Sequence, residues 1–407
     1  MNDLAAHYTR FRVAERLLLT GHSHQAWPDV AEQGLLDAFA DAALHVDGKW
    51  TAAFAKADRV RDGFRALLAD PAAEVALGGN THELVVRFLS AVDLSARPRL
   101  VTSDGEFHTL RRQLARLAEA GVDVVRVPAE PVDSLAERLA MATDDRTAAV
   151  LVSAVLFETS RIVPGLGELA AVAAARGVEL LVDAYHALGV VPFSVPAEGL
   201  GAAWVVGGGY KYLQLGEGNC FLRLPPHADR FRPVITGWYA EFAEVLSRSD
   251  EGRTRREAPK AGEPGDRVGY GPGALRFAGA TYDPTSHYRA ARVFDFFAEQ
   301  GLTVPRLREI SQHQTGVLAR RFDELDLPAD LVDRDRGAPR SAFGGFLALR
   351  SPRADALCAG LAERGVHTDS RGRFLRFGPA PYLSDGQLDA AMAALGETAE
   401  ALLSHGS

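Results

Sequence analysis

Residues 204–218 read WVVGGGYKYLQLGEG, with an apolar start, three glycines, and one lysine between two tyrosines. The apolar start is typical of a buried strand, and the glycines leave space around Lys211. A lysine that serves only solubility usually lies on an exposed helix face. The stretch therefore predicts a buried strand that leads to a lysine with a chemical role.

Short β-rich runs alternate with helical patterns on both sides of this stretch, from about residue 74 to 225. The predicted strands are EVAL, RLVTS, VDVVRVP, AAVLVS, VELLVD, AAWVVG and NCFLRL. Helical patterns such as THELVVRFLSAV and TLRRQLARLAEAG have apolar residues at three- and four-residue intervals. This alternation predicts an α/β fold with a mainly parallel, seven-stranded sheet covered on both faces.

The pattern changes near Pro284, where two long helical patterns lead into GFLALR, RADALCAGLAERG, FLRFG and a final helix. We expect an N-terminal segment (residues 1–50) that packs with the small domain, a large cofactor-binding domain (51–283) and a small α+β C-terminal domain (284–407). Residues 246–273 are rich in charge, glycine and proline. They predict a mobile loop, which we consider as a cover for the site.

The composition limits the classes of function. Hydrophobic residues make up 47% and charged residues 24% of the 407 residues, as in ordinary soluble enzymes, and a net charge of -8 argues against nucleic acid as a partner. No apolar run approaches the roughly 20 residues of a membrane span, and the N-terminus lacks a signal-peptide pattern. Cys220 and Cys358 make neither a disulfide framework nor a metal site. We expect a cytoplasmic protein without a metal or a membrane partner.

Three other strands are followed by residues suited to a ligand, which in such sheets binds at the carboxyl ends of the strands. Asp183 ends VELLV, with His186 three residues on, although a helix cap is the simpler role for this aspartate. GGNTHEL follows EVAL and would begin a helix. The free N–H groups at that helix start either bind a phosphate or are only capped by a side chain. GEFHTL follows RLVTSD, and its Phe107 either packs in the core or stacks on a planar ligand. Together with Lys211, these features predict a phosphorylated pyridine aldehyde as cofactor.

The chain resembles kynureninase and, more widely, the class V aminotransferase and cysteine desulfurase branch of fold-type I enzymes, which use pyridoxal 5'-phosphate (PLP). GYKYLQLGEG is similar to the kynureninase lysine segment, and DAYHALG to its D-x-x-H-x-x-G segment. RGVHTDSRGRFLRFGPAPYL resembles the stretch with the arginine for the substrate carboxylate. The resemblance runs from about LLLTGHSHQAWP to PYLSDGQL. It implies a homodimer with shared active sites.

The resemblance also implies a role for each matching residue. Lys211 forms the Schiff base with PLP and later moves protons, Asp183 pairs with the pyridinium N–H, and His186 lies near the ring hydroxyl. Phe107 stacks on the cofactor ring, and His108 is the alternative stacking residue. The other implied roles concern the phosphate and the substrate: Thr81, His82 and Tyr210 bind the phosphate, Tyr210 doubles as an acid or base, Trp238 and Thr281 reach the phosphate across the dimer, and Arg376 clamps the substrate α-carboxylate.

The segments that would contact the substrate depart from kynureninase. TGHSHQAWP, with His22 and His24, stands in place of GNSLG, and GATYDP in place of an SNP-type segment. Leu156 stands where kynureninases have an asparagine. These departures predict an intact cofactor frame and a substrate other than kynurenine. His22, His24 and His45 are the candidate substrate contacts or proton carriers, although single histidines are more often surface or packed residues.

The leading hypothesis is cleavage of a Cβ bond of an L-α-amino acid through an external aldimine. It would be either kynureninase-like hydrolysis or β-elimination from a cysteine S-conjugate. Enzymes of actinobacterial specialised metabolism that act on cysteine-conjugated antibiotic intermediates share this general look. Two alternatives stay open: an aminotransferase or decarboxylating oxidative deaminase, and a PLP-binding regulatory or structural protein without turnover. Keto acid, ammonia, CO2 and thiol would distinguish the reactions, and any released product would exclude the protein without turnover.

Overall fold

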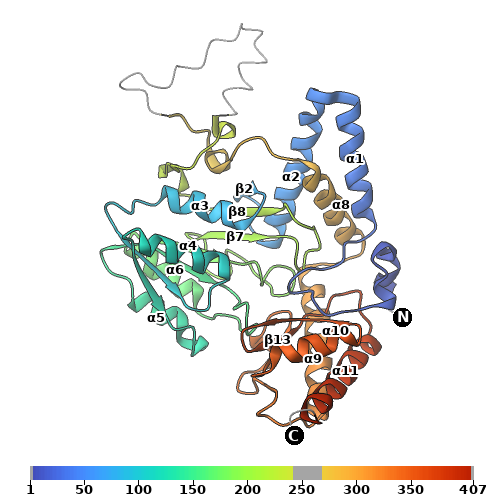
Figure 1. The fold of residues 1–407 in the computed structure, drawn as a ribbon. Helices are drawn as coiled ribbons and strands as arrows, with labels where there is room; N and C mark the ends of the chain where they lie inside the picture. Colours follow the sequence, from blue (N-terminus) through green and yellow to red (C-terminus); the bar gives the residue numbers. More distant parts are fainter. Residues whose placement is uncertain (1–2, 242–267, 405–407) are drawn as a thin grey trace.

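A seven-stranded sheet forms the centre of the computed structural model, which describes residues 3–241 and 268–404 (Figure 1). The strand order is β2-β8-β7-β6-β5-β3-β4, and neighbouring strands are parallel except at β8, which is antiparallel to both β7 and β2. The strands are β2 (Glu74–Gly78), β3 (Arg99–Ser103), β4 (Asp123–Val127), β5 (Thr147–Ser153), β6 (Glu179–Asp183), β7 (Trp204–Gly208) and β8 (Cys220–Leu224). Each overlaps a predicted strand, so the mainly parallel α/β sheet is confirmed.

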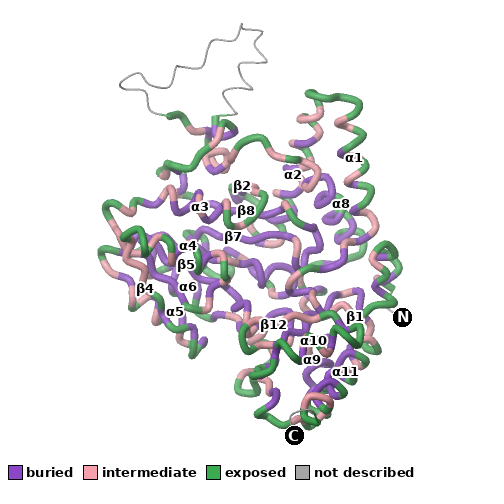
Figure 2. The backbone as a smooth tube through the Cα atoms, viewed as in Figure 1, coloured by how far each residue is buried: buried purple, intermediate pink, exposed green. Residues whose placement is uncertain are grey.

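Helices cover both faces of this sheet, because successive residues of a strand point to opposite faces. Val206 packs in the cluster under α3 (Thr81–Ala91) and α4 (His108–Glu119). Its neighbour Val205 packs in the large cluster on the other face. The helices of that second face are α2 (Trp50–Leu67), α5 (Leu135–Met141) and α6 (Leu166–Ala175). The central strands are accordingly buried, whereas several helices keep an exposed side (Figure 2).

The C-terminal part adds a second, smaller sheet with the strand order β12-β13-β10-β9. Its elements are α9 (Val304–Glu324), β9 (Asp333–Arg334), β10 (Leu347–Arg350), α10 (Ala354–Glu363), β11 (Val366–His367), β12 (Asp369–Arg371), β13 (Phe374–Phe377) and α11 (Asp385–Ser404). Sheet neighbours in this part are antiparallel. The arrangement agrees with the α+β pattern expected from the sequence.

The N-terminal residues reach both parts of the molecule. β1 (Leu17–Leu18) pairs in parallel with β11, and Thr20 bridges to Gly378. α1 (Val30–His45) and α2 both pack against α8 (Thr285–Glu299), beside the central sheet (Figure 1). Residues 18–24 are thereby held at the junction of the two sheets. Domain boundaries at residues 50 and 283 stay predictions.

Two sequence expectations concern segments away from the sheets. Most of the expected mobile loop, residues 246–267, lies outside the described residues. At its end, the Tyr270 hydroxyl donates to the carbonyl of Pro233 at 2.6 Å. Within residues 3–241 and 268–404, no helix is long and apolar enough to cross a membrane.

Candidate active site

The glycines before Lys211 allow three segments to meet around the lysine. A Cβ on Gly208 would lie 2.5 Å from both Cys220 Sγ and Tyr185 Oη, and a Cβ on Gly207 would lie 2.9 Å from the Phe221 ring. Any side chain there would push β8 or the turn after β6 away. Gly207 and Gly208 therefore let β8 and the turn after β6 close on the end of β7.

Lys211 itself is buried among aromatic rings and one histidine. Its Nζ lies 2.6 Å from His186 Nε2, 4.6 Å from the centre of the Tyr185 ring and 5.4 Å from that of Phe107. Burial lowers the pKa of Lys211 to about 7, although the nearby carboxylate of Asp183 raises it. Burial also lowers the pKa of His186 well below its ordinary value. Lys211 can therefore present a neutral, nucleophilic amine near neutral pH.

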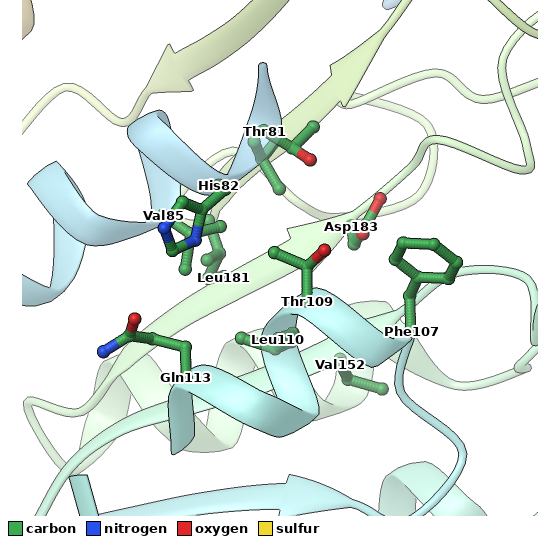
Figure 3. A pocket seen from close by; sticks show the side chains of 11 residues that line it. Thr81, His82, Val85, Phe107, Thr109, Leu110, Gln113, Val152, Leu181 and Asp183 are labelled. Carbon is green, nitrogen blue, oxygen red and sulfur yellow. The ribbon is translucent and has the colours of Figure 1, made fainter. Parts of the chain in front are cut away.

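Asp183 stands at the carboxyl end of β6, as expected. Its Oδ1 accepts a hydrogen bond from the backbone N–H of Tyr185 at 2.8 Å, so part of its role is to hold the turn. Its side chain also lines a small pocket, together with Thr81 and Phe107 (Figure 3). Burial raises the pKa of Asp183, whereas the Tyr185 bond and the field of Lys211 lower it. A partly buried carboxyl of this kind favours a cationic partner.

The start of α3 forms the other end of this space. Asn80 caps the helix, and its Oδ1 accepts from the N–H of Glu83 at 2.9 Å. Thr81 and His82 on the first turn line the pocket. Because first-turn N–H groups have no partner within their own helix, this end suits an anion. Tyr210 lines the adjoining cleft with the same residues.

A second group of side chains lies near Lys211, on the C-terminal part. Arg376 Nε donates to Asp369 Oδ1 at 2.8 Å, Nη2 donates to Asp369 Oδ2, and Nη1 donates to the carbonyl of Phe157. Buried His22 lies with Nε2 2.7 Å from the same Asp369 Oδ1. Burial lowers the pKa of His22 to about 4, although Asp369 opposes the shift, so the ring is neutral and donates to the carboxylate. The charge of Arg376 lowers the pKa of both His186 and Lys211, so this group lies in the neighbourhood of the lysine.

The remaining predicted residues lie farther out. His24 is exposed and stacks on Tyr210 at 4.8 Å. Trp238 Nε1 donates to Thr281 Oγ1 at 3.1 Å, and the tryptophan is 46% exposed. Neither Trp238 nor Thr281 lines the two described pockets. His45 is exposed at the end of α1.

Sequence reasoning missed two acidic residues that the structure brings to the site. Asp369 holds Arg376 and His22, and Glu106 is buried beside Phe107 with its carboxyl bound to Ser103 and Ser153. The sequence signal that could have found Glu106 is its position directly before Phe107, the residue expected to stack on the ring. No pattern along the chain indicates that Asp369 and His22, which are 347 residues apart, would pair. Within residues 3–241 and 268–404, no group of His, Cys, Asp and Glu could hold a metal ion.

The site fits the phosphorylated pyridine aldehyde that the sequence predicts. The buried amine of Lys211 lacks a carboxylate bonded to it in the described chain, and a carboxyl, an anion-binding helix start and an aromatic ring line the adjacent space. His186 Nδ1 is also buried without a partner in the described part of the chain. The amine would bind the aldehyde, the carboxyl the ring nitrogen, the helix start the phosphate, and the aromatic side chain the face of the ring.

Known proteins are similar to this chain over most of its length. No family model matches it. A kynureninase of Deinococcus radiodurans is 31% identical over 350 residues, which cover 83% of this chain and 77% of that protein. An isopenicillin N epimerase of Streptomyces clavuligerus is 27% identical over 349 residues, which cover 81% of each.

Solved structures share the fold at low sequence identity. A C-DES mutant with glycine covalently linked to its PLP cofactor has a TM-score of 0.81 at 16% identity, covering 96% of this chain and 98% of that one. An apo cysteine desulfurase from Thermococcus onnurineus has a TM-score of 0.76 at 16% identity, covering 98% of each chain.

Proposed function

The chain belongs to the kynureninase family of fold-type I PLP enzymes, which act on amino acids, and from this premise we propose that it breaks a bond at Cβ of an L-α-amino acid. The observation that supports this most is the buried Lys211 amine, which faces His186 and adjoins the pocket of Asp183 and Phe107. Family members that act at Cβ need such a lysine to move protons around Cα and the leaving group. Leu156 is buried where kynureninases have an asparagine, so the proposed substrate is not kynurenine.

The pocket residues would each hold one part of the cofactor. Lys211 would bind the aldehyde carbon, Asp183 would keep the ring nitrogen protonated, and Phe107 would lie on the ring. Thr81, His82 and Tyr210 line the end that would hold the phosphate. When bound, PLP supplies an electron sink for a bond at Cα of the amino acid.

Lys211 and His186 would then carry the protons. As a free amine, Lys211 has a pKa that burial lowers to about 7, which would suit both taking and giving a proton at neutral pH. His186 lies 2.6 Å from Lys211 Nζ, and its own lowered pKa keeps it a neutral acceptor that orients the amine. We propose that Tyr210, at the open side of the cleft beside His24, protonates the leaving group.

Arg376 would clamp the substrate carboxylate while it keeps its internal partners. The Asp369 carboxylate accepts from Nε–H and from one N–H of Nη2, and the Phe157 carbonyl accepts from one N–H of Nη1. A guanidinium has five N–H groups, so one donor on each Nη atom is not used by these bonds. Such a pair suits a bidentate carboxylate. Asp369 fixes the plane of the fork in advance, which favours one orientation of the substrate.

A product assay tests the proposed Cβ cleavage. Purified enzyme with PLP would be given cysteine S-conjugates and aroyl-alanine analogues, which carry a carbonyl at Cγ, and thiol, pyruvate, ammonia, alanine and carboxylic acid would be measured. Pyruvate, ammonia and thiol in equal amounts indicate β-elimination, whereas alanine with a carboxylic acid indicates hydrolysis. Keto acid that keeps the whole side chain, or CO2, would refute the proposal in favour of the aminotransferase or the decarboxylating oxidative deaminase.

Similarity to an isopenicillin N epimerase favours a second candidate, exchange of the α-proton without loss of the side chain. Both reactions need Lys211 as a base, but an epimerase also returns a proton on the opposite face. Incubation in D2O separates them. Inverted amino acid labelled at Cα, without thiol or pyruvate, would favour epimerisation and exclude Cβ cleavage.

We also propose a homodimer that completes each site. Leu36, Phe39, Leu44 and Val46, on or directly after α1, are apolar and more than half exposed, as is Val234. Apolar surface of this extent is typical of a protein-binding face. Trp238 and Thr281 hydrogen-bond to each other outside the pockets of their own chain, which suits a role at the partner's phosphate.

A further inference from the structure

Glu106 is a buried carboxyl that the proposed mechanism does not use. It is 2% exposed, on the turn between β3 and α4. One carboxyl oxygen, Oε1, accepts from Ser103 Oγ at 2.6 Å and from the N–H of Ser153 at 3.2 Å, and Oε2 accepts from Ser153 Oγ at 2.6 Å. Within residues 3–241 and 268–404 it forms no ion pair that would explain its burial. A buried acid without a cation is costly to keep charged, and such groups concentrate at functional sites.

The hydrogen bonds of Glu106 connect the end of β3, which leads to Phe107, with the end of β5, which is the neighbour of Asp183 on β6. Ser103 ends β3 and Ser153 ends β5, whereas Phe107 follows Glu106 directly. Ser153 is paired in register with Asp183 on β6, and the next residue, Ala154, donates its N–H to the carbonyl of Asp183 at 2.8 Å. Glu106 is therefore linked to Phe107, which would stack on the cofactor ring, and to the strand pairing that positions Asp183, which would bind the ring nitrogen.

The turn itself has little freedom. The N–H of Gly105 donates to Ser103 Oγ at 3.2 Å, and a Cβ on Gly105 would lie 2.8 Å from the Cβ of Ala129. Asp104, on the same turn, accepts from the N–H of Ala129 at 2.7 Å. The backbone that leads to Phe107 is thus fixed on both sides, with the Glu106 side chain as its link to β5.

The charge of Asp183 also acts on Glu106. Around it, β3 presents Ser103, β5 presents Ser153, and β6 presents the carboxyl of Asp183, whose field raises the pKa of Glu106. Burial is the largest cause of the shift and raises the pKa of Glu106 to about 7. The hydrogen bonds from Ser103 and Ser153 oppose it, because they lower the pKa. Two carboxyls at this end share one low-dielectric region, so the charge of one affects the proton affinity of the other.

We propose that Glu106 is a positioning residue of the PLP site, which fixes Phe107 on the ring through the ends of β3 and β5 and places a second carboxyl beside Asp183. The inference rests on the proposed roles of Phe107 and Asp183, not on the reaction that follows. Above its pKa of about 7, the Glu106 carboxylate would stabilise the protonated ring and so extend to higher pH the range over which the cofactor is an effective electron sink.

The experiment uses the holoenzyme without any amino acid. Glu106→Gln keeps the shape and removes the charge, Ser153→Ala keeps the charge and removes hydrogen bonds, and Glu137→Gln changes an exposed glutamate on α5 as the control. PLP affinity, the circular dichroism of bound PLP, its absorbance against pH and the melting temperature of the apoprotein would be measured for each. None of these readouts depends on Cβ cleavage, so failure of the proposed reaction leaves this test intact.

In Glu106→Gln we expect the pH at which PLP absorbance changes to fall by on the order of half a unit or more, because an anion is lost. In Ser153→Ala we expect weaker PLP binding by roughly threefold to tenfold and an altered dichroism, with a smaller pH shift. Glu137→Gln should match the wild type. Unchanged affinity, dichroism and pH curve in both site variants would overturn the proposal. So would a lowered apoprotein melting temperature with all cofactor readouts unchanged, because Glu106 would then be purely structural.

Discussion

At the residue scale, Lys211 shows how burial and a nearby charge compete. Asp183 favours the ammonium form, but the loss of water around Nζ outweighs it, and the pKa falls to about 7. His186 adds no positive charge at neutral pH, because burial lowers its pKa well below the ordinary value. Among the described residues, the site thus makes a neutral amine without a cationic neighbour close enough to bond to it. The consequence is a distinct pH dependence for cofactor uptake.

We expect apoprotein to take up PLP at a rate that rises through about pH 7 and levels off above it, because only the neutral amine attacks the aldehyde. An ordinary lysine would give a rise that continues toward pH 10. Stopped-flow absorbance near about 420 nm, followed by borohydride reduction and peptide mass mapping, would measure this. Asp183→Asn should move the midpoint to lower pH, since Asp183 raises the pKa of Lys211.

Lys211→Ala should leave the protein without the reducible band, whereas Lys56→Ala on α2 should behave as wild type. A label on Lys49, Lys56 or Lys260 in place of Lys211 would contradict the assignment, and so would a midpoint near pH 10.

Arg376 gives a second prediction at this scale. Replacing it by glutamine should raise KM for the amino acid far more than it lowers kcat, because a buried charge pair with the substrate carboxylate is lost, worth about 2–5 kcal/mol. Steady-state kinetics would measure this. The control is Arg373→Gln, an exposed arginine on the same hairpin. Equal KM values for both variants would place the carboxylate clamp elsewhere.

At the element scale, the glycines of β7 are a packing requirement. Gly208→Ala should lower the free energy of unfolding by about 1–3 kcal/mol, because its Cβ would lie 2.5 Å from Cys220 Sγ and Tyr185 Oη. The matched control is Gly201→Ala, since a Cβ there meets no atom within 4 Å. Urea unfolding would measure both. Equal stability of the two variants would mean that β8 and the turn after β6 yield easily.

The elements explain which parts of the site could be predicted. Lys211, Asp183, Phe107 and Thr81 each follow a strand or begin a helix, so local patterns and the rule for parallel sheets were enough to place them together. The bonds of Glu106 to Ser153 and of His22 to Asp369 join residues 47 and 347 positions apart. Such contacts depend on the register between strands and on the packing of two sheets, which no local pattern encodes.

At the scale of the whole molecule, the proposed dimer would let two chains share each site. Lys211 is buried and Asp183 is partly buried inside the chain, whereas Trp238 is nearly half exposed and Phe39 on α1 is 77% exposed. These two exposed regions belong to segments that flank the central sheet. A dimer would cover apolar surface and supply phosphate contacts at the same time.

Mixed dimers provide the decisive test of that arrangement. Lys211→Ala lacks the catalytic amine, and the double variant Trp238→Ala/Thr281→Ala lacks the phosphate contacts that it would give to its partner. In a mixed dimer, the chain with an intact Lys211 receives Trp238 and Thr281 from the Lys211→Ala chain, so one complete site forms. Co-expression with two affinity tags, isolation of the mixed species and a PLP-dependent activity assay would show about half the wild-type activity per dimer. If Trp238 and Thr281 served their own chain, the mixed dimer would be no more active than the mean of its parents. A double variant with full activity by itself would show that these residues have no role in the site.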